Sequence, residues 1–367
     1  MLYINIVVIG LLILQDFLLW VLGAYRFVDY SKQKEKVAWP MVSILVPARN
    51  EEVHLPACLQ SLEKLDYPES QLQFVIADDQ SDDNTLYIIK EWVTNGDNRV
   101  LVAIDSPRSK PINGKANALS QMARLARGEL LLFTDADCTV NPAWVKEMVR
   151  AHRKEGGLVT GITAVRTTSL FSAMQSLDWW LTLGMIKCTS DLVGSVTAMG
   201  NNMLVSKEAY LKVGGFENLP FSVTEDFALA QALIEKGFRP VHQVSPRSLV
   251  ITKGERTFVE LLKQRKRWMK GAMSLPWYWI LLLALQCGFF PAIIYLFIYD
   301  VYLGTGAWAM KIFVQSLFIN WFARRTGIRI SDPHLLLFEF YYMMVSWCTI
   351  VYYFWPSSIN WKERHYK

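Results

Sequence analysis

The chain has 367 residues, of which 52% are hydrophobic and only 19% are charged. Typical soluble domains carry about 25% charged residues, so this composition excludes an ordinary soluble protein and a disordered chain. The net charge of +5 does not indicate a nucleic acid partner, because Lys and Arg cluster beside apolar segments, where membrane topology explains them. We therefore expect part of the chain to face a lipid bilayer.

The first predicted element is a transmembrane helix over residues 1–25. Residues 1–15 carry no charge and the apolar character resumes after Asp16, which gives the roughly 20 residues that a bilayer crossing needs. A cleaved signal peptide is the competing interpretation, but the segment lacks a basic start and is long for such a peptide. Residues 26–40 follow as a basic linker.

Residues 41–255 are predicted to form an α/β domain. The expected strands cover residues 42–46, 72–77, 100–104, 129–134 and 158–165, and the expected helices cover 52–65, 84–93, 117–127 and 142–154. The last of these helices is expected to begin with Asn141 as its N-cap and Pro142 at its first position. Strands that alternate with helices in this way predict a doubly wound, mostly parallel sheet.

Polar residues follow three of the predicted strands at the point where each strand ends. They are Pro47, Arg49, Asn50 and Glu51 after the first strand, Asp78 and Asp79 after the second, and Asp135 and Asp137 after the fourth. Asp and Asn also form caps and turns, so each cluster alone has a structural explanation. Because ligands bind outside the carboxyl ends of strands in such sheets, their joint placement favours a ligand site.

The residue types in these clusters suit a metal-bound diphosphate. None of the five His or five Cys has metal-ligand spacing, and carboxylate ligands suit Mg²⁺ or Mn²⁺ completed by water and substrate phosphate. Asp135 and Asp137 would alternate in direction on a strand unless the chain turns, so we expect one to bind metal and its neighbour to reach a sugar. The chain has neither a G-x-G-x-x-G motif at the start of a helix nor a P-loop.

Three further residues are candidates for the same ligand. Asp79 is suited to accept hydrogen bonds from a base. Lys110 and Lys115 lie in a loop from which they could approach phosphates, although a solvated loop explains them equally well.

A possible general base precedes the predicted helix over residues 227–236. Thr224, Glu225 and Asp226 stand at its start, where a carboxylate caps the helix. Repulsion between the adjacent carboxylates would also raise the basicity of Asp226, which could then take a proton from an attacking hydroxyl group. The two interpretations are compatible.

Residues 256–275 are predicted to form an amphipathic helix at the membrane interface. Gln264, Arg267, Trp268 and Gly271 are spaced to share one helical face, which could cover a nucleotide diphosphate and a sugar. The positive-inside rule explains the other stripe, which is made of Lys263, Lys266 and Lys270, so we expect those lysines to face lipid head groups.

Residues 276–356 are predicted to hold about three transmembrane or membrane-embedded helices. The span over 277–299 is uncharged, whereas Lys311 interrupts the span over 306–323 and Glu339 interrupts the span over 335–355, so these two could instead be re-entrant or interfacial. The positive-inside rule predicts that residues from about 27 to 275 lie in the cytosol and that the amino terminus lies outside. The basic tail over residues 357–367 conflicts with an outward carboxyl terminus, which leaves the number of spans open.

With these motifs in order, the chain resembles the membrane-integrated inverting family-2 glycosyltransferases, which have a GT-A catalytic domain and include ceramide glucosyltransferases, cellulose synthases and hyaluronan synthases. The resemblance covers about residues 42–271. It implies that Asp79 contacts the base, that Asp135 and Asp137 serve the metal-bound diphosphate, and that Asp226 is the catalytic base. It further implies that Gln264, Arg267 and Trp268 line the donor site and that Gly200 and Asn201 lie on the acceptor side.

The resemblance implies transfer of one sugar from a nucleotide-sugar donor, expected to be UDP-linked, to a lipid or lipid-linked acceptor. Few spans follow the catalytic domain, which disfavours a long channel, but a processive polysaccharide synthase remains the alternative. The stretch 170–198 with Trp179 and Trp180 could admit an amphiphile or could equally be an ordinary buried helix. A glycosidase would need no metal-diphosphate site, and a receptor or channel would place polar residues in its spans.

Overall fold

The computed structural model describes residues 1–32, 38–105, 112–152, 156–195, 197–275, 277–357, 359–361 and 364–366. These residues form two compact units. The α/β unit comprises Val28–Ala164, Thr189–Lys253 and Asn360–Lys367, and the helical unit comprises Met1–Phe27, Val165–Cys188 and Gly254–Ile359.

A seven-stranded sheet forms the centre of the α/β unit, with strand order β3-β2-β1-β4-β8-β6-β9. The strands are β1 (Val42–Ala48), β2 (Leu72–Asp78), β3 (Arg99–Ala103), β4 (Leu130–Phe133), β6 (Leu158–Thr160), β8 (Met203–Ser206) and β9 (Val241–His242). Neighbours pair in parallel except β8, which runs antiparallel to β4 and β6. The predicted doubly wound, mostly parallel sheet is confirmed.

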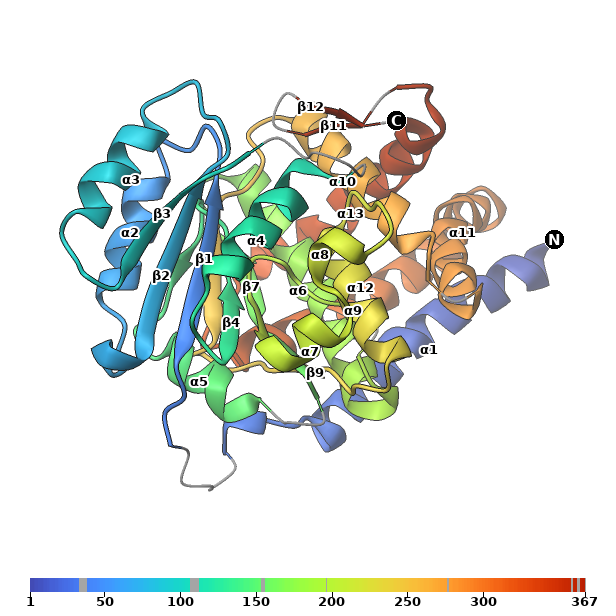
Figure 1. Ribbon diagram of the computed structural model, residues 1–367. Helices are drawn as coiled ribbons and strands as arrows, with labels where there is room; N and C mark the ends of the chain where they lie inside the picture. Colours follow the sequence, from blue (N-terminus) through green and yellow to red (C-terminus); the bar gives the residue numbers. More distant parts are fainter. Residues whose placement is uncertain are drawn as a thin grey trace. The chain divides into compact units, whose positions relative to one another are not determined.

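Helices cover both faces of this sheet (Figure 1). They are α2 (Leu55–Glu63), α3 (Thr85–Val93), α4 (Gly114–Leu125), α5 (Trp144–Ala151), α7 (Lys207–Lys212), α8 (Gly215–Asn218) and α9 (Glu225–Glu235), with short 3₁₀ turns at Tyr30–Lys32 and Glu69–Gln71. Ile44 packs in the core that α2, α3 and α5 complete, whereas Leu45 packs in the core that α4 and α9 complete. This alternation is the period of two that a strand buried on both faces requires.

One predicted strand is divided in the structure for a local reason. The strand expected over 158–165 is divided into β6 and β7 (Ile162–Val165), and β7 pairs in a separate sheet of order β5-β10-β7 with β5 (Thr139–Val140) and β10 (Leu249–Thr252). The division falls at Gly161, where a Cβ would lie 2.3 Å from the side chain of Asn202.

The predicted N-cap of α5 is wrong. The helix begins at Trp144, and the Asn141 side chain instead accepts a hydrogen bond of 2.9 Å from the N–H of Ala143 in the preceding turn. The expected end at residue 154 lies outside the described residues.

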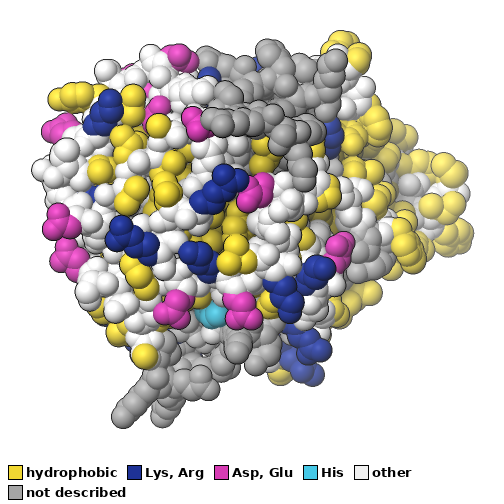
Figure 2. Space-filling model, viewed as in Figure 1, with side chains coloured by type: hydrophobic (Ala, Val, Ile, Leu, Met, Phe, Trp, Pro, Cys, Tyr) yellow, Lys and Arg dark blue, Asp and Glu magenta, His cyan; other side chains and the backbone are white. Residues whose placement is uncertain are grey.

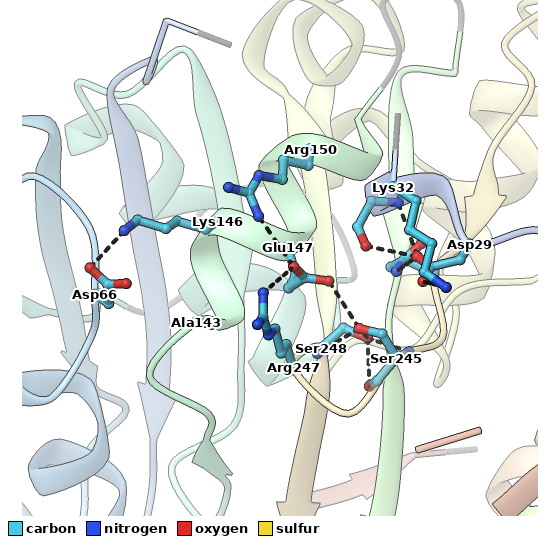
Figure 3. Close-up of polar contacts among 12 residues, drawn as sticks. Asp29, Lys32, Asp66, Ala143, Lys146, Glu147, Arg150, Ser245, Arg247 and Ser248 are labelled. Atoms are coloured by element: carbon cyan, nitrogen blue, oxygen red, sulfur yellow. Dashed lines mark hydrogen bonds and ion pairs between the residues drawn. The ribbon is translucent and has the colours of Figure 1, made fainter. Parts of the chain in front are cut away.

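Helix α5 also holds the turn that leads into β10. The buried carboxylate of Glu147 accepts a hydrogen bond of 3.1 Å from the hydroxyl of Ser245 and pairs with Arg150 at 3.5 Å and Arg247 at 3.9 Å (Figure 3). Because the turn is fixed at Ser245, the path of β10 is fixed as well, and β10 delivers Lys253 to the rim of the sheet.

The helical unit contains α1 (Leu2–Arg26), the first part of α6 (Leu170–Val193), α10 (Phe258–Ala272), α11 (Trp277–Tyr299), α12 (Val301–Arg324) and α13 (Asp332–Phe354), and a short pair of strands, β11 (Ile359–Trp361) and β12 (Arg364–Tyr366), closes the chain. Among the described residues, three helical segments are long and apolar enough to cross a membrane: Leu2–Lys32, Trp279–Tyr299 and Asp332–Phe354. Hydrophobic side chains gather on the surface formed by α1 and α11 (Figure 2). A surface of this kind suits contact with lipid.

The charges that interrupt the predicted spans point into the helical unit. Asp16 of α1, Lys311 of α12 and Glu339 of α13 are each no more than 2% exposed. Lys311 forms an ion pair with Asp16, and Glu339 acts on it electrostatically. The interruptions are therefore buried contacts between helices, as expected for ionisable groups in a membrane protein.

The expectation that Lys266 faces lipid head groups is wrong. Its side chain is buried, and its ammonium group donates hydrogen bonds to the backbone oxygens of Trp355 at 2.7 Å and Ser357 at 3.1 Å. These carbonyl groups follow the end of α13, so Lys266 caps that helix. Lys263 and Lys270 are exposed, as expected.

Candidate active site

The first two polar clusters meet at the carboxyl ends of β1 and β2. The Arg49 guanidinium donates a hydrogen bond of 2.7 Å to the backbone oxygen of Asp79, and the Asn50 side chain accepts one of 2.9 Å from the N–H of Asp82. Asn50 and Gln80 have φ angles of 51° and 59°, a region that non-glycine residues rarely adopt. Such strain is common at functional sites.

Asp78 and Asp79 are both buried at this rim. One carboxylate oxygen of Asp78 accepts a weak hydrogen bond of 3.3 Å from the N–H of Ser81, and its other oxygen has no hydrogen-bond partner within the part of the chain that the structure describes. A buried acceptor without a partner is costly. It is therefore suited to accept a donor group from a ligand.

The chain turns directly after β4, so Asp135 and Asp137 do not occupy alternate positions of one strand. The Asp135 carboxylate lies 2.5 Å from the ammonium of Lys115, whereas the Asp137 carboxylate lies 3.4 Å from the ammonium of Lys253. The two carboxylates therefore have different cationic partners, and the expectation that one binds metal while its neighbour reaches a sugar stays a prediction.

Lys115 joins two of the predicted motifs. Its ammonium is 2.5 Å from Asp135 and 3.4 Å from Glu225, and its side chain is only 14% exposed, so it does not belong to a solvated loop. Burial alone would lower the pKa of Lys115, but the carboxylates of Asp135 and Glu225 raise it above its usual value. The lysine therefore stays charged at neutral pH. Lys110 lies outside the described residues.

Asp226 stands in the first turn of α9, at the position expected for a general base. Its carboxylate accepts hydrogen bonds of 2.7 Å from the N–H of Gly200 and 2.8 Å from the N–H of Phe227. Burial and then repulsion from Glu225 raise the pKa of Asp226 to about 6, although Lys115 and the two N–H groups lower it. A pKa near the working pH is favourable for a general base.

The predicted acceptor residues have different contacts within their own units. Gly200 contacts Asp226 directly through its N–H, and a Cβ at this position would lie 3.2 Å from Asp226. The Asn201 side chain accepts a hydrogen bond of 3.0 Å from the hydroxyl of Thr163 on β7. Trp180 lies in the helical unit, where it is 1% exposed and packs on Phe322. This burial is what the alternative interpretation of residues 170–198, an ordinary buried helix, predicts.

Lys253 is a residue of this site that the sequence did not reveal. Its ammonium lies 3.0 Å from both carboxylate oxygens of Glu51 and 3.4 Å from Asp137, so it joins the first cluster to the third. Burial lowers the pKa of Lys253, but Asp137 and Glu51 raise it above its usual value overall. Lys253 follows β10 as the acidic clusters follow their strands, but β10 was not among the predicted strands.

Asn113 was also missed. Its side-chain oxygen caps α4 by accepting a hydrogen bond of 2.7 Å from the N–H of Ala116. Its amide group donates to the backbone oxygen of Ser222 at 2.6 Å and to Glu225 at 3.4 Å. Asn113 explains why α4 begins before the expected residue 117, and it fixes the segment that carries Glu225.

Gln264, Arg267 and Trp268 lie on α10 of the helical unit. The Gln264 amide donates a hydrogen bond of 2.6 Å to the Glu255 carboxylate. The Trp268 ring packs edge-on against Trp179, with the ring centroids 5.4 Å apart. Trp179 is thus in contact with a residue of the predicted donor motif.

The carboxylates are suited to a metal that is held mainly by its substrate. Among the residues that the structure describes, no three His, Cys, Asp or Glu side chains converge as a metal cage. Mg²⁺ and Mn²⁺ sites with substrate phosphates need only one or two carboxylates. Asp137 and Asp135 meet that requirement, and both already lie beside cations that a metal would have to replace.

Comparisons with known proteins agree on the class of the chain. A family model described as Glycosyl transferase family 21 matches residues 2–367. The chain is 29% identical over 233 residues to the poly-beta-1,6-N-acetyl-D-glucosamine synthase of Staphylococcus epidermidis, covering 63% of this chain and 54% of that protein. It is 29% identical over 274 residues to the beta-monoglucosyldiacylglycerol synthase of Trichormus variabilis, covering 71% and 54%. The chain spans about half the length of the curated relatives it matches.

A solved structure shares the fold. The mannosyltransferase PcManGT from Pyrobaculum calidifontis, in complex with GDP-Man and Mn²⁺, superposes with a TM-score of 0.60 at 17% identity, covering 97% of this chain and 100% of that one. The fold is therefore that of GT-A glycosyltransferases.

Proposed function

The chain belongs to glycosyl transferase family 21. On that premise we propose that it transfers a single sugar from a UDP-linked sugar donor to a hydroxyl group of a membrane lipid. One observation carries this proposal. The partly buried carboxylate of Asp226 interacts electrostatically with Glu225 and Lys115, and Lys115 forms an ion pair with Asp135, so the proposed base and the proposed diphosphate-binding edge belong to one charged cluster.

The donor would bind along the rim formed after β1, β2 and β4. The open acceptor oxygen of Asp78, with Asp79 beside it, suits hydrogen bonds from the base or ribose. Arg49, Asn50 and Glu51 hold the rim in shape. Lys115 and Lys253 supply positive charge for the diphosphate.

Asp137 and Asp135 would hold a Mg²⁺ or Mn²⁺ ion, which when bound neutralises the departing diphosphate. The Mn²⁺ in the complex of the mannosyltransferase with the same fold supports a divalent ion. Lys115 beside Asp135 and Lys253 beside Asp137 would also neutralise part of the negative charge of the diphosphate.

The chemical step needs one proton acceptor. Asp226 takes the proton of the acceptor hydroxyl while that oxygen bonds to the anomeric carbon of the sugar, and the bond from this carbon to the diphosphate oxygen breaks. Attack from the side opposite the leaving group inverts the anomeric centre. The Gly200 N–H holds the Asp226 carboxylate in place, and a side chain at position 200 would crowd it.

The lipid acceptor rests on two observations. Three described helical segments are long and apolar enough to cross a membrane, which supports a multi-pass protein beside lipid. The basic flanks of the spans favour a cytosolic catalytic domain. A relative with 29% identity is a beta-monoglucosyldiacylglycerol synthase.

The alternative, a processive polysaccharide synthase, is supported by the poly-beta-1,6-N-acetyl-D-glucosamine synthase at the same identity.

A single assay tests the proposal. The purified protein in liposomes would be given radiolabelled UDP-glucose, UDP-N-acetylglucosamine or GDP-mannose with diacylglycerol or ceramide, with and without a chelator. We expect one labelled glycolipid whose size does not change with time and whose formation from a UDP-sugar needs a divalent ion. A product that lengthens with time would establish the polysaccharide alternative, and full activity in excess chelator would contradict the metal assignment.

A further inference from the structure

One face of α6 contacts the motif that begins at Gln264. Gln175, Asp178 and Trp179 are spaced by three and four residues and therefore share a face of the helix. Each has a partner in or beside the motif on α10, and all of these residues belong to the helical unit. The contacts are hydrogen bonds, an ion pair and a ring contact, so they restrain both the position and the orientation of the side chains on α10.

Gln175 acts on the motif through Glu255. Its amide group donates a hydrogen bond of 2.9 Å to the backbone oxygen of Glu255, and its oxygen accepts one of 2.8 Å from the Glu255 N–H. The Glu255 carboxylate in turn accepts the bond of 2.6 Å from Gln264. The first residue of the motif is therefore oriented from α6.

Asp178 acts through Arg265, a residue inside the motif to which the motif pattern assigns no role. The Arg265 guanidinium lies 2.5 Å from the Asp178 carboxylate, and both side chains are largely buried. The guanidinium carbon also stands 4.6 Å from the centre of the Trp268 ring. Trp179 contacts the same indole, so the Trp268 ring packs against both side chains.

The energetics indicate a role in orientation. Taking two charges out of water costs free energy that their attraction repays only in part, and apolar residues of the same size often stabilise a fold as well or better. A guanidinium held by a carboxylate has a fixed plane, and it can stack on an aromatic ring as an ammonium group cannot. The pair therefore gives Trp268 a defined orientation that apolar packing alone would not.

We propose that Asp178 and Arg265 are positioning residues for sugar transfer: they fix the orientation of the Trp268 indole, with Trp179 as its other contact. This inference rests on the proposed function and deepens it. It also gives Trp179 a role in the donor motif in place of the acceptor role expected from the sequence.

Arg265→Lys separates this role from a merely structural one. Lysine keeps a charge for Asp178 but loses the planar face against Trp268. We expect a thermal unfolding temperature close to that of the unaltered protein, and kcat/KM for the donor reduced roughly tenfold with the KM for the acceptor unchanged, since small misplacements of a positioning group cost about this much or more. An unchanged donor kcat/KM, or a loss matched by an equal change in acceptor KM, would overturn the proposal.

A double-mutant cycle tests whether Arg265 acts through Trp268. In a Trp268→Ala background, Arg265→Lys should have no further effect on donor kcat/KM, whereas independent sites would give losses that multiply. Lys263→Met, an exposed change on the same helix, is the matched control and should behave as the unaltered protein. If the unaltered protein transfers no sugar, the proposed function fails and the positioning role with it; if it transfers sugar and the losses multiply, only the positioning role fails.

Discussion

The two units each contain a cluster of opposite charges, and the clusters differ in how closed they are. At the rim of the sheet, Lys115 and its partner Asp135 are 14% and 31% exposed, and Lys253 and its partner Asp137 are 35% and 18% exposed. In the helical unit, Asp16 and Lys311 are 1% and 2% exposed. A ligand can reach the charged groups of the first cluster and replace their ion-pair partners. The charged groups of the second cluster are closed to any ligand.

This difference predicts opposite consequences of mutation. Removing one member of a closed cluster leaves an uncompensated buried charge, which mainly affects stability. Removing one member of an open cluster leaves its partner in contact with water, so stability changes little and ligand binding changes more. The same types of residue thus do structural work in one unit and chemical work in the other.

Asp226→Asn should have the largest effect on activity. Asparagine can still accept the hydrogen bond from Gly200, but it cannot take a proton, so kcat should fall by roughly 10² to 10⁴ while donor affinity and thermal stability are kept. Steady-state kinetics and thermal unfolding would measure both. A parallel fall in donor affinity with kcat unchanged would make Asp226 a binding or capping residue.

Lys311→Met should have the largest effect on stability. It leaves Asp16 and Glu339 as buried carboxylates without their cation, at a cost of about 3–5 kcal/mol, which thermal unfolding in detergent would measure. Adding Asp16→Asn to this variant should restore part of the loss. The comparison between the units breaks if Lys311→Met unfolds at the same temperature as the unaltered protein.

Lys253→Met should have the smallest effect of the three variants, and it should act mainly on donor binding. Its loss removes one positive charge from the donor site, so the KM for the donor should rise roughly tenfold. The buried Glu51 carboxylate loses this ammonium group but Asp137 keeps contact with water, so the unfolding temperature should fall less than in Lys311→Met. Lys146→Met is the matched control, because Lys146 pairs with Asp66 at 2.6 Å in the same unit (Figure 3). Equal donor KM values for the two variants would remove Lys253 from the site.

Much of the rim was predictable from the sequence, because β1, β2 and β4 are apolar runs with polar residues directly after them. Lys253 was missed for the complementary reason: β10 has only four residues and is buried on one face alone, so its pattern is weak. The contact between Asp226 and Gly200 joins a helix start to a loop 26 residues earlier in the chain. Local sequence patterns cover only a few residues, so they cannot predict such a contact.

The faces of helices were predictable, but their neighbours were not. The spacing of Lys266 assigns it to a stripe of lysines, yet the structure places the end of α13 over it. In the same way, Asp16, Lys311 and Glu339 each weaken a span when it is considered alone. Their pairing is a property of the assembled helices.

The pH dependence of kcat tests the central claim, that Asp226 at the rim is the base of the reaction, most directly. With a pKa of about 6 for Asp226, its active, deprotonated form is lost as the pH falls, so kcat at saturating donor should be constant above this value and fall about tenfold per pH unit below it. Asp226→Asn should show residual activity that is flat across the same range. If both proteins showed the same fall below about pH 6, the titrating base would be another residue and the account would be contradicted.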